Sequence, residues 1–352
     1  MNTYNNITKQ GTVIKRGLLV LLSVFLFYAC KKEADQTNNE LKVNIIGIEA
    51  LGDSPIKQAQ ASTNKNSVKS ATANTVISAN GKRYETTLSL QNNAPEENAK
   101  PKTLNHAVQQ SANKSLQANG IIEILKPISY NLRFYTAQNS YYFYTYTEIP
   151  RNYSAVQLTA DMSHHWVTYS FNSTSQALPG ISQDAMNQPN TKTEVLADYG
   201  IYDMRPGGGN SIDIIFKRKT AQIAIKFDAT ALNAKIISLK VRDKDNVFKV
   251  GYYQIGRGTF RQIGTATGPI TSLLNSDFAK VTGSPVDQVR IGNYFTAATT
   301  ALPNFKLQVE ECIIEKDGVQ ISLPLDILTF PGIITPEIGK STLLTVKIKE
   351  LP

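Results

Sequence analysis

The sequence predicts an all-β protein built from β-sandwiches, and three observations support this prediction. Segments rich in Val, Ile, Tyr and Phe recur at roughly ten-residue spacing and are separated by turn residues. Residues 212–227 alternate apolar and polar side chains, which is typical of antiparallel strands that cover a core with one face. The chain shows neither βαβ alternation nor a long helical pattern.

The first 29 residues are predicted to be a secretory signal peptide. Two basic residues precede an uncharged apolar run, residues 17–29, which is too short to cross roughly 30 Å of hydrocarbon. Cys30 follows directly, so the stretch resembles a lipobox, at which bacterial lipoproteins are cleaved and acylated on the new N-terminal cysteine. The alternative is an uncleaved N-terminal anchor with an incidental cysteine. Residues 30–40 are predicted to be a solvated tether, because after the cysteine they contain no apolar residue larger than alanine.

Length predicts two domains after the leader. The chain has 352 residues, and the roughly 320 that remain exceed one ordinary domain. We place the boundary near residue 200, close to a Pro- and Gly-rich break at residues 205–210. This gives an N-terminal sandwich at residues 41–200 and a C-terminal sandwich at residues 201–352.

Charge and cysteine content restrict the function classes. The formal net charge of +9 falls to +6 without the three basic residues of the leader. The remaining basic residues are scattered singly among acids, which argues against nucleic-acid binding. Beyond Cys30 the only cysteine is Cys312, so no intramolecular disulfide can form and an exported chain must depend on its hydrophobic core.

The sequence predicts strands in some parts of the chain and irregular structure in two polar segments. Residues 41–48 and 84–90 predict the first two strands, whereas the polar segments 57–81 and 91–120 carry no helical stripe and are expected to be irregular, either functional or disordered. Two hairpins are predicted, one from residues 130–135 and 141–146 and one from residues 212–216 and 221–227. Later strands are expected at residues 237–241, 288–295, 305–314, 319–323 and 343–349.

No catalytic, metal or cofactor site is predicted. Asp161, His164 and His165 lie close together, but adjacent histidines on a strand point to opposite faces and do not easily share one ion, so a surface pair is favoured. Cys312 is expected to be a buried, inert thiol that faces away from Val309. An enzyme such as a glycosidase would need convergent carboxylates, which the sequence does not display.

The aromatic run 141–146 is the one ambiguous feature. Half of its side chains should enter the core. The outward half could stack on sugar rings, although cross-strand aromatic packing is the commoner use of such residues.

Several motifs, taken in their order along the chain, resemble the fimbrillin family of Bacteroidetes, which comprises major and accessory pilins and their anchors. The motifs are the lipobox, Tyr130–Tyr135, Leu196–Tyr199, Ile212–Ile225 and Ile338–Ile348. The resemblance implies two transthyretin-like β-sandwiches in tandem. It also implies export as a palmitoylated lipoprotein of the outer membrane, exposed at the cell surface or assembled in a fimbrium.

The resemblance further implies polymerisation by strand donation. A protease removes an N-terminal strand, and a strand of the next subunit fills the groove by pairing with the open sheet edge. In this chain residues 41–48 are the strand that could be removed, and Arg83, the first arginine after Cys30, could be the cleavage site. The donated face would consist of Leu344, Val346 and Ile348. The alternative is that both end strands complete their own sheets.

The leading hypothesis is therefore a structural or adhesion component of a surface fimbria, as pilin or accessory subunit, with other fimbrial subunits and the outer membrane as partners. The alternative is a monomeric surface lipoprotein that binds a glycan or a host protein through its loops. Neither hypothesis requires a cofactor.

Overall fold

The computed structural model describes residues 40–352, except for positions 54–55, 58–70, 92–119, 123, 125–126, 136–140, 147–153, 180–184, 256–258, 263–271 and 282–286. The predicted leader and Cys30 therefore lie outside the described residues. The described residues form strands, turns and two short 3-10 helices, η1 (Thr230–Leu232) and η3 (Asn275–Asp277), without an α-helix, which confirms the all-β prediction. No helix in this part of the chain has the length and apolar character needed to cross a bilayer.

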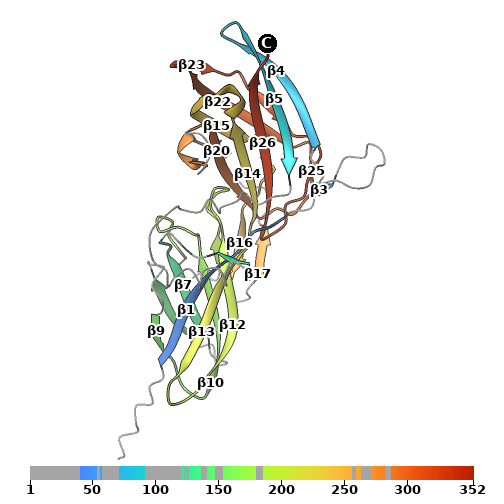
Figure 1. Cartoon of the computed structure of the whole chain (residues 1–352). Helices are drawn as coiled ribbons and strands as arrows, with labels where there is room; N and C mark the ends of the chain where they lie inside the picture. Colours follow the sequence, from blue (N-terminus) through green and yellow to red (C-terminus); the bar gives the residue numbers. More distant parts are fainter. Residues whose placement is uncertain are drawn as a thin grey trace, which may run out of the picture.

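The first sandwich is a single eight-stranded sheet that folds over on itself (Figure 1). Strand β12 meets β13 at only two residue pairs, so the two halves of the sheet separate and enclose a core between them. The strands are β1 (Glu40–Glu49), β6 (Ile121–Ile122), β7 (Tyr130–Tyr135), β8 (Tyr141–Tyr146), β9 (Ser154–Gln157), β10 (Met162–Ser170), β12 (Leu196–Met204) and β13 (Asn210–Arg218). The core side chains include Leu41, Val43, Leu132, Phe134, Ile214 and Phe216.

The second sandwich packs a seven-stranded sheet against a five-stranded sheet, and the largest apolar cluster of the described residues lies between them. The seven-stranded sheet contains β2 (Gly52–Asp53), β4 (Ala71–Ala79), β5 (Lys82–Gln91), β14 (Ala221–Asp228), β19 (Phe278–Lys280), β20 (Val289–Thr296) and β26 (Lys340–Glu350). The five-stranded sheet contains β15 (Lys235–Asp243), β18 (Ser272–Leu273), β22 (Lys306–Lys316), β23 (Val319–Ser322) and β24 (Ile327–Thr329).

Two three-stranded sheets complete the fold. One consists of β11 (Ala185–Asn187), β16 (Gly251–Gln254) and β17 (Thr259–Gln262), and the other of β3 (Ile56–Lys57), β21 (Leu302–Pro303) and β25 (Ile333–Ile334). A third apolar cluster joins Tyr253 and Ile255 to β10, β11 and β12 of the first half of the chain. The two sandwiches are therefore connected by packing as well as by the chain.

The sheets do not follow the expected division near residue 200. Strands β4 and β5 lie in the second sandwich beside β26, although β1 lies in the first, and β13 returns to pair with β1. The chain thus crosses between the sandwiches several times. The boundaries of independently folding domains stay a prediction.

The predicted hairpin of residues 212–216 and 221–227 is wrong. Strand β13 pairs with β1 and β12, whereas β14 pairs with β20 and β26 in the other sandwich. At the crossing the N–H of Lys219 donates to the Val195 carbonyl at 2.8 Å, and the Thr220 carbonyl accepts the N–H of Gly339 at 3.1 Å. These contacts with other segments take the place of a turn that would return the chain on itself.

Two further expectations are corrected. The segment 57–81 was expected to be irregular, but it contains the nine residues of β4. Cys312 and Val309 were expected on opposite faces, but both are buried in one core, because an irregularity opposite Lys240 and Val241 places an extra residue, Glu310, in β22.

The predicted hairpin of β7 and β8 is confirmed, with Tyr130 opposite Tyr146.

Candidate functional site

The first strand after the predicted tether, β1, lies in a slot of the first sandwich. It pairs in parallel with β13 from Leu41, opposite Asn210, to Ile48, opposite Phe216. Its other border meets β9 at residues 40–43 and β6 at residues 48–49. Leu41, Val43 and Ile48 are buried in the core, so β1 contributes one face to the packing of this sandwich.

A close backbone approach and two side-chain hydrogen bonds hold β1 beside its neighbours. Gly47 lies where a side chain does not fit, because a Cβ there would be 2.4 Å from the Ile122 carbonyl oxygen. Just beyond it, Nε of Arg218 donates to the Glu49 carbonyl at 3.0 Å. On the outer face Nδ2 of Asn44 donates to Oδ1 of Asp213 at 2.9 Å. The end of β1 is therefore tied to β13 by side chains as well as by the ladder.

The C-terminal strand β26 is central in its sheet. It runs parallel to β14 and antiparallel to β5, and both ladders extend over most of its length. The predicted donor face is fully buried in the core of the same sandwich: Leu344, Val346 and Ile348. In this structure both end strands complete sheets of their own chain, so strand donation remains a proposal.

Arg83 is exposed at the start of β5, next to the Asn80–Gly81 turn that joins β4 to β5. It pairs with Ser78 of β4, and its carbonyl accepts the N–H of Leu351 at 2.8 Å. Cleavage here would leave β1 and β4 on one fragment and β5 on the other.

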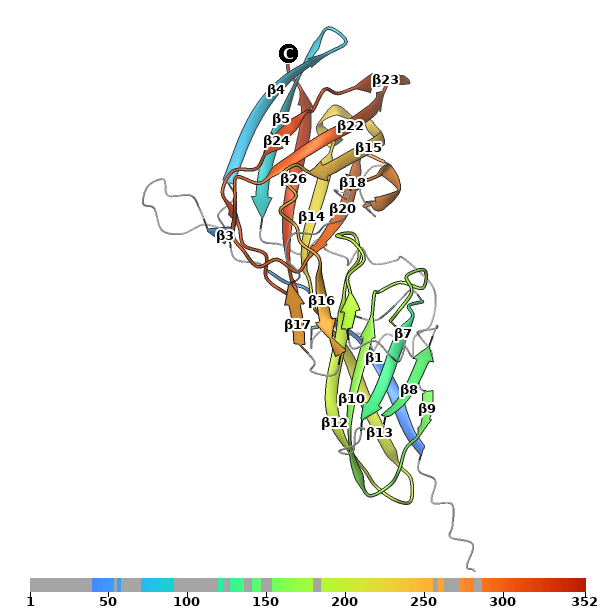
Figure 2. The ribbon, with the colours of Figure 1, turned by 180° about the vertical axis from the view of Figure 1, so that it is seen from behind.

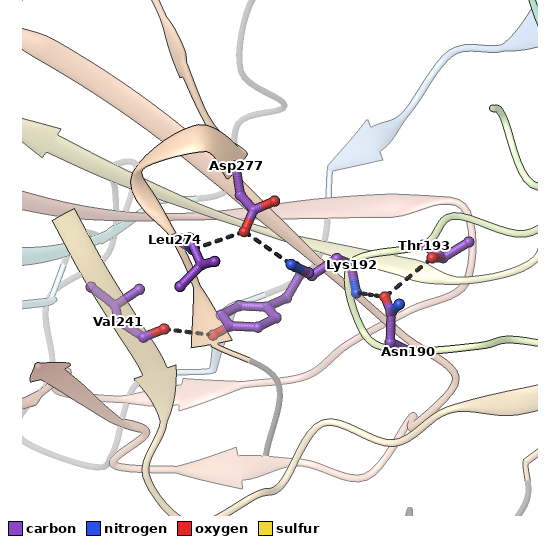
Figure 3. A network of polar contacts seen from close by, with 7 residues as sticks. Asn190, Lys192, Thr193, Val241, Leu274 and Asp277 are labelled. Atoms are coloured by element: carbon purple, nitrogen blue, oxygen red, sulfur yellow. Dashed lines mark hydrogen bonds and ion pairs between the residues drawn. The ribbon is translucent and has the colours of Figure 1, made fainter. Parts of the chain in front are cut away.

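A polar network joins the two sandwiches (Figure 3). Oδ1 of Asn190 accepts the backbone N–H of Lys192 at 2.8 Å and the hydroxyl of Thr193 at 3.1 Å, which shapes the loop before β12. The ammonium group of Lys192 then reaches Oδ2 of Asp277 in the second sandwich at 3.0 Å. The same oxygen accepts the N–H of Leu274 at 2.8 Å.

Gln188 bridges the same junction. Its Nε2 donates to the carbonyls of Thr193 at 2.8 Å and Phe295 at 2.9 Å, and its Oε1 accepts the N–H of Gly251 at 3.3 Å. The N–H of Phe295 also donates to the Thr191 carbonyl at 2.6 Å. Backbone groups from both sandwiches are thus paired across the junction, which favours one fixed arrangement of the two.

A buried ion pair lies where the chain crosses from β13 to β14. Glu194 and Arg218 are paired, and their side chains are only 4% and 6% exposed. The second carboxylate oxygen of Glu194 accepts Nδ2 of Asn172 at 2.8 Å. Beside it Nζ of Lys219 lies 6.0 Å and 5.8 Å from the ring centroids of Tyr199 and Tyr253, and burial lowers the pKa of this lysine.

An exposed apolar pair on the outer face of β12 was missed from the sequence. Tyr199 is 54% exposed and Ile201 is 63% exposed. On this face of the sheet Ile201 lies opposite the exposed His165, whereas Tyr199 lies opposite Val167, which is buried. The period-two spacing of Tyr199 and Ile201 was a signal for a common face, but it does not say which face is covered.

The other candidates from the sequence are the adjacent histidines, Cys312 and the aromatic run 141–146. His164 is buried, with Nε2 2.9 Å from the Thr159 carbonyl, whereas His165 is exposed, as adjacent residues of a strand should be. The described residues contain no group of three metal-ligating side chains. Burial raises the pKa of the Cys312 thiol to about 12, which fits the expected inert thiol. Side chains of the aromatic run 141–146 lie outside the description.

Comparisons with known proteins give structural likeness only. No family model matches the chain, and no curated protein matches it. Among solved structures, an inferred cell adhesion protein of Bacteroides fragilis NCTC 9343 is similar with 10% identity, a TM-score of 0.42, and coverage of 88% of this chain and 93% of its own. One of Bacteroides uniformis ATCC 8492 has 10% identity, a TM-score of 0.40, and coverage of 65% and 92%. The fimbrial anchor protein Mfa2 of Porphyromonas gingivalis has 10% identity, a TM-score of 0.28, and coverage of 54% and 69%.

Proposed function

We propose that this chain is a lipid-anchored surface protein of the fimbrillin type, which acts as a pilus subunit or an accessory adhesion protein. The observation that supports this most directly is the place of β1. The first strand after the predicted tether fills a slot beside β13 and supplies three buried aliphatic side chains, Leu41, Val43 and Ile48. Its removal would open a groove lined by an unpaired strand and an exposed core.

Energetics favour exchange of this strand over simple loss. Each buried aliphatic side chain contributes about 1.5–3 kcal/mol, so an unfilled groove would cost a large part of the roughly 5–15 kcal/mol that stabilises a typical domain. A fragment cut at Arg83 should therefore stay bound until another strand with the same alternation replaces it. The spacing of Leu344, Val346 and Ile348 matches that of Leu41, Val43 and Ile45, although β26 would first have to leave the centre of its own sheet.

Limited proteolysis tests this proposal. An arginine-specific protease, applied to residues 30–352 with Cys30→Ser, should cut at Arg83, leave the fragment bound, and yield polymer ladders on gels as subunits exchange strands. Arg83→Gln should abolish the ladders, whereas Arg205→Gln, at another exposed arginine, should not. Trimmed protein that stays monomeric at high concentration contradicts strand exchange.

Peptide capture tests the donor. A synthetic peptide of residues 340–350 should bind the cleaved protein and displace the fragment, and a scrambled peptide should not. Equal binding of both peptides would exclude β26 as the donor.

The anchor is tested separately. Cys30→Ala should abolish incorporation of radiolabelled palmitate and retention in the membrane fraction. Continued labelling of this variant would remove the lipoprotein assignment.

A second candidate function is favoured by the surface around Tyr199 and Ile201. The exposed side chains of Tyr199 and Ile201, which lie on one face of β12, suit contact with the apolar face of a sugar or with a host protein. A glycan array of the monomeric protein should show binding that Tyr199→Ala reduces at least tenfold. If binding is absent or unchanged in the variant, this surface is not a glycan site.

A further inference from the structure

Strand β4 forms one border of the seven-stranded sheet. The strand order is β19, β20, β14, β26, β5 and β4, and all nine residues of β4 pair with β5. No other described strand pairs with β4. Its second row of backbone N–H and C=O groups therefore faces outward along nine residues.

This border lacks the protection that sheet edges usually carry. Natural edge strands are short or contain charged residues or proline, which discourage pairing with another chain. Residues 71–79 contain no charged residue and no proline. The opposite border, β19, is three residues long and ends at Lys280, whose ammonium group pairs with Asp287 at 2.7 Å.

The exposed side chains of β4 are suited to contact with another strand. Val76 is 49% exposed, and Asn74 and Ser78 on the same face are exposed, as is Thr75 on the opposite face. On the face of Thr75, Ile77 packs against the core, which holds the strand in one register. The border is thus a fixed and uncharged template, not a frayed end.

We propose that β4 pairs antiparallel with β4 of a second copy of this chain. Centred on Thr75, such pairing matches all nine residues, with Asn74 opposite Val76, Ala73 opposite Ile77 and Thr72 opposite Ser78. The paired residues are small, β-branched or, at Asn74, an uncharged amide, and none carries charge. The contact is symmetric and closes after two copies, as most homodimer contacts do. It differs from strand donation because neither copy gives up a strand.

The direction of β4 in each copy determines how the two paired copies are oriented. β4 runs lengthwise along the second sandwich toward the end that carries the C-terminus, whereas β1 begins at the opposite end of the molecule (Figures 1 and 2). Antiparallel pairing reverses the second copy. The starts of β1 in the two copies then lie at opposite ends of the pair, so the two proposed anchors belong to two facing membranes.

This step rests on the proposed lipid anchor at Cys30. An edge contact of this kind is smaller than the roughly 1,600 Å² of a stable interface, so single pairs are weak. Many pairs between two membranes act together, and avidity makes the contact between cells strong. The second sandwich is then a homotypic adhesion surface.

Cysteine cross-linking tests the pairing and its register. The protein is residues 30–352 with Cys30→Ser, in which the remaining Cys312 is buried. Thr75→Cys faces its own copy in this register and should give disulfide-linked dimers under mild oxidation. Ser78→Cys is the matched control, since it faces residue 72 and should give few dimers alone but a heterodimer with Thr72→Cys. Equal dimer yields from Thr75→Cys and Ser78→Cys would indicate parallel pairing and contradict the antiparallel register. The absence of dimers from every variant would overturn the proposal.

Vesicle clustering tests the adhesion itself. The wild-type thiol of Cys30 can be coupled to a maleimide lipid, because Cys312 is not accessible. Vesicles carrying the protein should cluster, and Val76→Lys, a charge at an exposed position, should abolish clustering while the thermal unfolding midpoint is unchanged. Clustering that survives Val76→Lys contradicts the proposal. Because coupling is chemical, this result is independent of acylation in cells, so failure of the anchor and failure of the pairing are distinguishable.

Discussion

The ion pair of Glu194 and Arg218 offers the sharpest test of how the crossing from β13 to β14 is stabilised. Both side chains are almost fully buried. Arg218 also donates to the Glu49 carbonyl at the end of β1. Glu194→Gln keeps the shape of the side chain but removes the negative charge, which leaves a buried guanidinium group without a counter-charge.

The magnitude follows from burial. Breaking a buried pair by removing one partner costs about 3–5 kcal/mol, because the remaining charge stays desolvated. A solvent-exposed pair contributes about 0–1 kcal/mol. Lys235 and Glu315, 3.2 Å apart with side chains 54% and 29% exposed, provide such a control.

The assay is urea unfolding of residues 30–352 with Cys30→Ser. Glu194→Gln should lower the unfolding free energy by about 3–5 kcal/mol, and Lys235→Gln by less than about 1 kcal/mol. The double variant Glu194→Leu, Arg218→Met should recover most of the loss, since an apolar pair leaves no buried charge. If Glu194→Gln is no more destabilising than Lys235→Gln, the buried ion pair does not stabilise the crossing from β13 to β14.

Three further predictions concern other positions. A Cβ at Gly200 would lie 2.8 Å from the ring of Trp166, so Gly200→Ala should cost about 1–3 kcal/mol and shift the emission of this sole tryptophan; unchanged emission and midpoint would contradict the packing. Cys312 should react with a thiol reagent at pH 8 only when the protein unfolds, since its pKa is raised to about 12 by burial; fast labelling of the native protein would disprove this. Burial raises the pKa of Asp243 from 3.8 to about 6, so the native state binds this proton more tightly than the unfolded state, and the resulting stabilisation is present below pH 4 and is lost as the pH rises through 6. Relative to wild type, Asp243→Asn should therefore gain up to about 3 kcal/mol in unfolding free energy between pH 4 and pH 7, and parallel pH profiles of the two proteins would contradict it.

Residue alternation predicted many of the strands correctly. Residues 41–48 and 343–349 alternate apolar and polar side chains, and both form strands with one face in a core. The pattern failed where the chain contains an irregularity. At Glu310 one extra residue enters β22, so Val309 and Cys312 reach the same core despite their odd separation.

The composition of residues 71–79 did not predict the strand β4. Its residues are mostly small or polar and all are uncharged, and among the side chains described, at residues 73–79, Ile77 and Ala79 pack against the core. All nine residues pair with β5, and a local sequence pattern does not display this pairing. The exposed border that this strand creates was therefore invisible from the sequence.

The sequence by itself determined the all-β class and the face that most strands turn to the core, because a strand's side chains alternate at every residue. Only the tertiary structure decided which strands are neighbours. Residues 212–227 show this, since two segments that alternate as a hairpin enter different sandwiches. Backbone hydrogen bonds are alike for every partner, so partner choice depends on which cores can be closed, and that is a property of the whole chain.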